Sequence, residues 1–115
     1  MKTAMIWGAH GGIGQALMRQ LRADGWTVLG VARQAGRLQG LADVVLEADA
    51  GKPHEVQQAV AAASQEVDAI DLWVYTAGDI ASATVGEMAP VAWQRILDAN
   101  LTGAFLAAHY SLPLL

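Results

Sequence analysis

The sequence predicts an α/β fold in which helices cover both faces of a parallel β-sheet. Two observations support this prediction. Short apolar segments alternate along the 115 residues with longer segments in which apolar side chains recur every three or four positions, and this alternation is typical of strands connected by helices. The short segments are apolar at nearly every position, as expected of strands that are buried on both faces of a parallel sheet.

Four segments are predicted to be strands because each is a short apolar run bounded by turn residues or charged residues. They are residues 3–7 (TAMIW), 27–32 (TVLGVA), 43–49 (DVVLEAD) and 70–78 (IDLWVYTAG). Right-handed crossovers between consecutive parallel strands favour the order 3-2-1-4. This order forms the first half of a doubly wound, Rossmann-like nucleotide-binding fold, and the length fits one domain over residues 1–115.

Three segments are predicted to be helices. The first is IGQALMRQLRAD, which Gly25 is placed to end. Pro53 opens the second, because proline is tolerated at the first helical position. Residues 91–112 form one long helix, in which Gly103 weakens the helical pattern locally. The apolar residues of this long helix are expected to face the sheet: Ile96, Leu97, Leu101, Phe105 and Ala108.

Composition and charge exclude several classes of partner. The Lys and Arg residues are scattered and the formal net charge is −4, so we expect no nucleic-acid partner. The chain has no cysteine, and His54 and His109 lack partners at metal-ligand spacing, so we expect neither a disulfide nor a metal site. No apolar run reaches the roughly 18 residues of a membrane span, and no segment resembles a secretory leader. We therefore expect a cytoplasmic protein without a membrane partner.

The most informative local pattern is the stretch WGAHGGIG, between the first strand and the first helix. Its spacing is G-x-x-x-G-x-G, and glycine there lets the backbone turn sharply and approach a ligand closely. The start of a helix also offers unpaired N–H groups and a positive dipole end to an anion. We therefore expect the pyrophosphate of a dinucleotide to bind here, the alternative being a glycine-rich loop without a ligand.

The candidate phosphate contacts in this loop are Gly8, His10, Gly12, Ile13 and Gly14. His10 either touches phosphate oxygens or serves as a spacer between the glycines.

The segment GAHGGIG resembles the cofactor loop of the short-chain dehydrogenase/reductase family, and further segments resemble family motifs in the same order along nearly the whole chain. By this resemblance, Asp49, which is followed by Ala50, matches the family's aspartate that hydrogen-bonds the adenine ring. The segment DANLTGAF resembles the family's N-x-x-G helix, which makes Asn100 the match for the asparagine of the catalytic helix.

The segment YTAG resembles the family's N-N-A-G segment, and the resemblance adds Ala77 and Gly78 to the expected cofactor contacts. Two departures from the family pattern stand nearby. Trp7 replaces the usual Thr before the first glycine, and Tyr75 and Thr76 replace the two asparagines. We expect both departures to loosen the hydrogen bonding that holds the strand ends, without removing the phosphate site.

The end of the second strand predicts which dinucleotide is bound. An acidic residue about 20 residues past the glycines selects NAD by binding the ribose 2′-hydroxyl, but here Ala32 occupies that position and Arg33 follows it. A guanidinium binds a 2′-phosphate, which a carboxylate would repel, so we expect NADP(H) rather than NAD(H). In the alternative, Arg33 is only a solvated loop residue. Arg37 is either a second phosphate contact or a surface charge.

The resemblance implies hydride transfer between NADP(H) and a small-molecule carbonyl or alcohol, with a Ser, a Tyr-x-x-x-Lys pair and an Asn at the catalytic centre. Only Asn100 has a match, because neither Tyr75 nor Tyr110 is followed by lysine four positions later. We therefore expect the cofactor-binding half of such an oxidoreductase, truncated after the fourth strand and its following helix, and whether this chain is itself an enzyme stays open. The alternative is an inactive dinucleotide-binding or interaction module complete at 115 residues.

Two features predict self-association. The fourth strand has an open apolar edge, and such edges tend to pair with another chain. The chain is 54% hydrophobic and 16% charged, against about 25% charged in typical domains, as expected of one part of a larger core. Because the family commonly builds its oligomer interface with the long helix, we expect a homo-oligomer through residues 91–112 or through the sheet edge.

Overall fold

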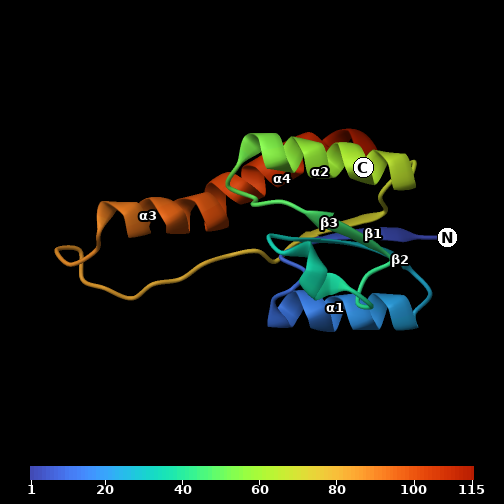
Figure 1. Cartoon of the computed structure of the whole chain (residues 1–115), viewed down its shortest axis with the longest axis horizontal. Coiled ribbons are helices and arrows are strands. Elements are labelled where there is room, and N and C mark those ends of the chain that lie inside the picture. The colour runs from blue at the N-terminus through green and yellow to red at the C-terminus, as the bar shows by residue number, and fades with distance from the viewer.

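The computed structural model describes all 115 residues and contains a four-stranded parallel sheet with helices on both faces (Figure 1). The strands are β1 (Thr3–Trp7), β2 (Thr27–Ala32), β3 (Val44–Glu47) and β4 (Leu72–Tyr75), and they lie in the order β3-β2-β1-β4. The predicted α/β fold and strand order are therefore confirmed. β1 and β2 have the predicted bounds, whereas β3 and β4 are shorter than predicted.

Two carboxylates explain why β3 and β4 begin later than predicted. Asp43 Oδ2 accepts a hydrogen bond from Val28 N–H at 2.8 Å, and Asp71 Oδ2 accepts one from Thr3 N–H at 2.8 Å. Each aspartate thus fastens the amino end of the neighbouring strand and belongs to the turn that precedes its own strand.

The helices are α1 (Gly12–Ala23), α2 (Pro53–Glu66), α3 (Pro90–Leu97) and α4 (Gly103–Ser111), with two short 3-10 turns, η1 (Ala35–Leu38) and η3 (Leu112–Leu114). Gly25 follows the end of α1 with a φ of +87°, a left-handed conformation that glycine adopts without steric cost. The long helix predicted over residues 91–112 is present as α3 and α4, joined by the π-helical turn η2 (Asp98–Thr102).

The π-helical turn η2 changes which side of the long helix faces the sheet. Gly103 N–H bonds to the carbonyl oxygen of Asp98, five residues back, so this turn holds one residue more than an α-helical turn. The prediction that Leu101 and Phe105 face the sheet is therefore wrong, since they are 67% and 63% exposed. The buried residues of α4 lie on the neighbouring side: Gly103, Ala107 and Ser111.

Side chains from the strands alternate between two cores, one on each face of the sheet. From β1, Met5 and Trp7 enter the core beneath α2 and α4, whereas Ala4 and Ile6 enter the core against α1. Each of these four residues is at most 1% exposed. Burial on both faces is the physical reason for the uninterrupted apolar runs in the sequence.

β4 is an edge strand that pairs with β1 alone. All four of its residues are half-buried, whereas all five residues of β1 are buried. The sheet therefore ends on one side in an apolar strand with an unpaired backbone edge, as predicted.

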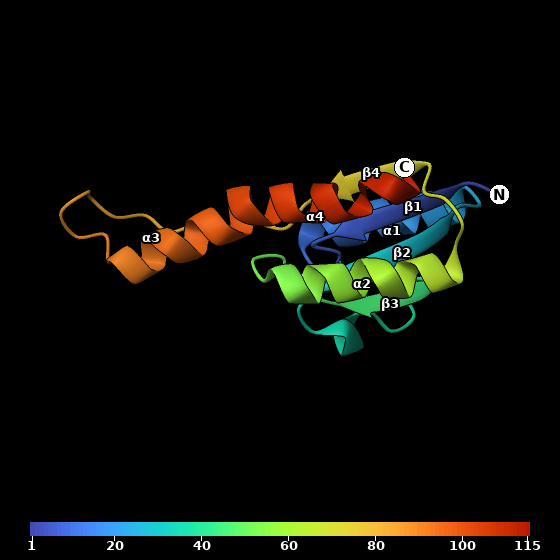
Figure 2. The ribbon, with the colours of Figure 1, turned by 90° about the horizontal axis from the view of Figure 1, so that it is seen from above.

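Residues 79–97, here called the arm, extend away from the sheet (Figures 1 and 2). The arm consists of the loop after β4 and of α3, and no residue of α3 is buried. It accounts for the elongated shape of the chain, whose principal extents are 51 × 26 × 22 Å. None of the helices combines the length and the apolar character that a membrane crossing requires.

Candidate functional site

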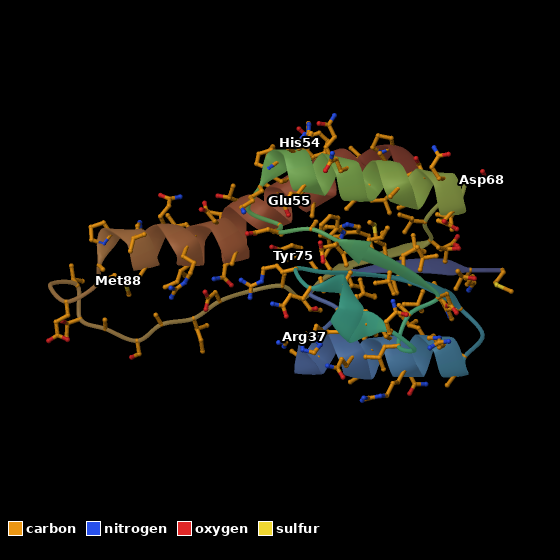
Figure 3. The ribbon with its side chains drawn as sticks, viewed as in Figure 1. Arg37, His54, Glu55, Asp68, Tyr75 and Met88 are labelled. Carbon is orange, nitrogen blue, oxygen red and sulfur yellow. The ribbon has the colours of Figure 1, made fainter.

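A cleft of about 970 Å³ lies at the carboxyl ends of the strands, where the loops after all four strands meet the arm. Figure 3 labels Tyr75, at the carboxyl end of β4, and Arg37, which lies on the side of α1. In open parallel sheets ligands bind at the carboxyl ends of the strands, where the connections after neighbouring strands leave toward opposite faces of the sheet. The predicted site residues that line the cleft are Gly8, His10, Arg33, Asp49, Ala50, Ala77 and Gly78.

The glycine loop packs so closely that two of its positions exclude a side chain. Gly8 has a φ of +73°, and a Cβ added there would overlap the backbone of Ala77, at the end of β4. Gly14 is buried, and a Cβ added there would overlap the carbonyl oxygen of Gly8. Glycine at these two positions lets the end of β1, the start of α1 and the end of β4 meet.

The other predicted loop contacts, Gly12, Ile13 and Gly14, are not among the residues that line the cleft. They form the first turn of α1, which has no side-chain cap, so their N–H groups are the unpaired donors of a helix start. Space around the Cβ position of Gly12 is open, and Ile13 is 75% exposed. What this turn can offer an anion is therefore backbone N–H groups.

His10 is held from two sides. Gln15 Nε2 donates to the carbonyl oxygen of His10 at 2.6 Å, and a guanidinium nitrogen of Arg37 lies 3.2 Å from His10 Nε2. Because Arg37 belongs to η1, this contact joins the glycine loop to the segment that follows β2.

Two arginines after β2 line the cleft without a carboxylate partner. Ala32 is buried at the end of the strand, and the exposed Arg33 follows it. Neither Arg33 nor Arg37 takes part in an ion pair; the ion pairs of the chain join Arg22 to Asp43, Lys52 to Glu55 and Arg95 to Asp79. Neither guanidinium is therefore paired with a carboxylate.

Asp49 follows β3 and uses one carboxylate oxygen to shape its own loop. Its Oδ1 accepts a hydrogen bond from Gly51 N–H at 3.0 Å, and its own N–H donates to Glu55 Oε1 at 3.0 Å. The second carboxylate oxygen makes no hydrogen bond within the chain. The loop is thus fixed by its own polar groups, and one acceptor stays free beside Ala50 at the cleft.

Thr76 corrects one expectation from the sequence. Its hydroxyl donates to the carbonyl oxygen of Trp7 at 2.7 Å and lies 3.1 Å from that of Gly8, and its N–H donates to Trp7 at 2.9 Å. The strand ends are therefore joined at this position by hydrogen bonds from both the hydroxyl and the N–H of Thr76. The expected loosening is wrong for Thr76.

Tyr75 ties the end of β4 to the π-helical turn. Its hydroxyl donates to the carbonyl oxygen of Ala99, within η2, and a Cβ at Gly103 would overlap that hydroxyl. Burial, and secondly the charge of Asp49, raises the pKa of the Tyr75 phenol above its ordinary value. The phenol therefore stays protonated at neutral pH and acts as a hydrogen-bond donor to the helix.

Asn100 does not line the cleft but holds the start of the arm. Its Nδ2 donates to the carbonyl oxygens of Asp79 at 2.6 Å and of Ile96 at 2.8 Å, and its Oδ1 lies 3.3 Å from Asp79 N–H. The carboxylate of Asp79 in turn accepts a hydrogen bond from Arg95 Nε at 2.7 Å. The asparagine side chain is thus fully engaged in fixing the backbone immediately after β4.

Sequence reasoning did not identify Asp79 and Arg95 as residues of this cleft, which they line together. They stand 16 positions apart, across a loop and part of a helix, so no periodic pattern links them. The one available signal was a charged residue directly after the glycine that ends the YTAG segment.

The family described as short chain dehydrogenase matches residues 2–115. Serine 3-dehydrogenase of Agrobacterium fabrum is 34% identical over 120 residues, which cover 98% of this chain and 48% of that protein. An uncharacterized oxidoreductase of Staphylococcus aureus is 28% identical over 119 residues, which cover 97% of this chain and 52% of that protein. The chain therefore spans about half the length of these curated relatives.

Solved structures show the same arrangement. A 3-ketoacyl-ACP reductase from Sinorhizobium meliloti is similar with a TM-score of 0.92 at 30% identity, over 97% of this chain and 48% of that one. A variant of the actinorhodin polyketide ketoreductase with NADPH is similar with a TM-score of 0.89 at 27% identity, over 96% of this chain and 46% of that one. The Rossmann-like fold predicted from the sequence is therefore confirmed.

Proposed function

The chain belongs to the short-chain dehydrogenase family, whose members are oxidoreductases that use nicotinamide dinucleotides. We propose that the cleft of this chain binds NADP(H). We also propose that it forms the cofactor-binding part of an enzyme that acts on a carbonyl or alcohol substrate. The observation that carries the choice of cofactor is the pair of guanidinium groups without a carboxylate partner, those of Arg33 and Arg37, beside the uncharged Ala32.

The donor groups of the glycine loop fit a pyrophosphate. Gly8 and Gly14 bring the loop into a shape that a side chain would obstruct, and the first turn of α1, which has no side-chain cap, begins directly after Gly11, a residue that lines the cleft. Backbone donors and the positive end of a helix dipole favour phosphate oxygens. In this proposal Gly12, Ile13 and Gly14 contribute their N–H groups, and Gly8 permits the close approach.

The preference for NADP(H) over NAD(H) follows from charge. A guanidinium at the end of β2 can donate two parallel hydrogen bonds to a 2′-phosphate, whereas an NAD site places an acid there to accept from the ribose hydroxyl. The similar ketoreductase structure with NADPH supports the same choice. Asp49, with one free carboxylate oxygen, is proposed to accept a hydrogen bond from the adenine amino group, beside Ala50.

The far end of the cleft is proposed to receive the nicotinamide, which when bound supplies or accepts a hydride. Ala77 and Gly78 offer a wall without bulky side chains there, and Asn100 fixes the neighbouring backbone. The protonated Tyr75 donates its hydrogen bond to the helix and is not proposed as the general acid of the reaction. The family's Ser and Tyr-x-x-x-Lys do not occur in these 115 residues.

Self-association through the long helix or the sheet edge remains part of the proposal. Leu101 and Phe105, exposed on the long helix, and the unpaired edge of β4 are the surfaces that support it. Sedimentation of the full chain tests this part independently of cofactor binding.

Substituting Arg33 tests the proposed cofactor. Arg33→Asp should weaken NADPH binding by roughly 100-fold, because it replaces a phosphate donor with a repelling charge, and should leave NADH affinity within about threefold. Titration calorimetry with both nucleotides provides the measurement. Arg19→Asp, the same charge reversal on exposed α1 outside the cleft, is the matched control. Equal losses for the two nucleotides would contradict the proposal.

Turnover can exclude the alternative, a dinucleotide-binding module without catalysis. NADPH oxidation with a panel of small aldehydes and ketones would contradict that alternative, whereas tight binding without oxidation is expected of both, because the family's catalytic Tyr-x-x-x-Lys is not among these 115 residues.

A further inference from the structure

We propose that His10 is a positioning residue for cofactor selection: it holds the guanidinium of Arg37 toward the place of the 2′-phosphate, so that the glycine loop itself contributes to the preference for NADP(H). The inference rests on the proposed NADP(H) site. It assigns His10 a role beyond those expected from the sequence, since it acts through Arg37.

The sheet topology brings the two loops together. β1 and β2 are adjacent parallel strands in which Trp7 pairs with Val31, and beyond the strand end Ala9 N–H still bonds to the carbonyl oxygen of Val31 at 3.0 Å. His10 therefore emerges beside the end of β2, where Ala32 and Arg33 stand. A side chain at this position can reach the segment that selects between the two dinucleotides.

The contact between His10 and Arg37 has a defined donor and acceptor. A guanidinium has no acceptor atom, so Arg37 donates and His10 Nε2, 3.2 Å away, accepts through its lone pair. The backbone of His10 is held as well, because Gln15 Nε2 donates to the carbonyl oxygen of His10 at 2.6 Å. The position from which this acceptor reaches Arg37 is thus fixed.

The chemistry of this acceptor suits a phosphate site. A carboxylate in the place of His10 would neutralise Arg37 and repel a phosphate, whereas a neutral imidazole fixes the guanidinium and leaves its charge available. The backbone that carries Arg37 is fixed as well, because Ala35 N–H, at the start of η1, donates to Glu47 Oε1 at 3.1 Å. Holding an arginine in place before binding reduces the rotamer entropy that binding would otherwise remove.

Two conservative variants separate this role from a general effect on the loop. His10→Gln keeps an acceptor at about the distance of Nε2 from the backbone. His10→Asn places its acceptor nearer the backbone, at about the position of Nδ1, where it cannot accept a hydrogen bond from Arg37. We combine both with Arg37→Ala and measure NADPH and NADH affinity of the full chain by titration calorimetry. Lys2→Ala, which removes a charge at the amino ends of the strands, opposite the cleft, is the control.

We expect the variants to lose affinity for NADPH and not for NADH. His10→Asn and Arg37→Ala should each weaken NADPH binding roughly tenfold, which corresponds to one charge-assisted hydrogen bond. NADH affinity should stay within about twofold, and His10→Gln should retain most of the NADPH affinity. In the double variant His10→Asn with Arg37→Ala, the loss should not exceed that of Arg37→Ala alone.

Three outcomes would overturn the inference, and the third is distinguishable because it also overturns the proposed cofactor preference. Additive losses in the double variant, or equal losses for NADH, with the wild-type preference for NADPH intact, would reject the positioning role alone. Equal wild-type affinity for NADPH and NADH would reject the proposed cofactor preference and this inference with it.

Discussion

β1 and β4 are neighbouring apolar strands of the same sheet, yet they differ in how far the structure encloses them. Every residue of β1 is buried, between strands on both sides and helices on both faces, whereas every residue of β4 is half-buried. The helices that follow the two strands differ in the same way. α1 buries Gly14, Met18 and Leu21, whereas α3, in the arm, buries none of its residues.

This difference separates the two ends of the cleft. The glycine loop and the arginines after β2 stand on strands whose packing is complete, so their geometry is fixed by the cores on both faces. The two ends of the arm are joined by polar contacts, those of Asn100 with Asp79 and Ile96 and the ion pair between Asp79 and Arg95. Preorganised donors are what phosphate recognition requires, and the β1–α1–β2 region supplies them.

The largest effect is expected from Gly8, where both sides of the comparison meet. Gly8→Ala should lower the free energy of unfolding by roughly 3 kcal/mol or more, since φ is +73° and the added Cβ would overlap the backbone of Ala77. Gly12→Ala, whose Cβ meets open space in the same loop, should change stability by less than about 1 kcal/mol. Urea denaturation provides both values, and similar losses would refute the packing described for the loop.

Truncations in the two regions test the comparison directly. Ile6→Ala, at a fully buried position of β1, should cost about 3 kcal/mol of unfolding free energy, because it leaves a cavity. Val91→Ala on the arm, where the residue is 79% exposed, should cost less than about 0.5 kcal/mol. Val74→Ala, in half-buried β4, should fall between them. If Val91→Ala lowered the free energy of unfolding as much as Ile6→Ala, the description of the arm as exposed would be contradicted.

Removing the hydroxyl of Tyr75 should have a smaller effect. Tyr75→Phe deletes the hydrogen bond to the carbonyl oxygen of Ala99 and should lower the free energy of unfolding by about 1 kcal/mol. Tyr110→Phe is the matched control, since the Tyr110 hydroxyl makes no hydrogen bond within the chain. If the two variants are equally stable, the bond between β4 and η2 contributes nothing measurable.

The smallest effect concerns alkaline pH. Burial, then the charge of Asp49, raises the pKa of Tyr75 above its ordinary value of 10.0, so the unfolded chain loses this proton at a lower pH than the folded chain. The contribution to stability is fully present below pH 10 and is lost as pH rises through the folded value. The difference in unfolding free energy between wild type and Tyr75→Phe should therefore shrink above pH 10. A difference in unfolding free energy that grows above pH 10 would contradict a raised pKa of Tyr75 in the folded chain.

The strand order and most helix positions could be predicted from the sequence because they follow from local patterns. Apolar runs doubly buried in a parallel sheet give Thr3–Trp7 and Thr27–Ala32 their bounds, and the glycine spacing locates the start of α1. The π-helical turn could not be predicted from the periodic pattern, and the contact made there by Tyr75, with the carbonyl oxygen of Ala99, joins residues 24 positions apart. Its extra residue turned Leu101 and Phe105 outward, against the periodic pattern.

The candidate site was predictable in its backbone and less so in its side-chain contacts. Arg33 and Asp49 could be assigned from their places after strands. The partnership of Arg37 with His10 and that of Arg95 with Asp79 depend on tertiary structure. Thr76 shows the same limit, because only its position beside Trp7 reveals that its hydroxyl holds the strand ends.

Gly12→Asp gives the most direct test of the central claim, that the glycine loop and the start of α1 bind the phosphates of a dinucleotide. The new side chain meets open space, and an acid in the first helical turn does not destabilise a helix, so the fold should keep its stability. We measure NADPH and NADH binding by titration calorimetry, with Gly86→Asp on the arm, also in open space, as the control. The account predicts roughly 100-fold weaker binding of both nucleotides, from like-charge repulsion, at an unchanged free energy of unfolding. Binding retained within about threefold would contradict it.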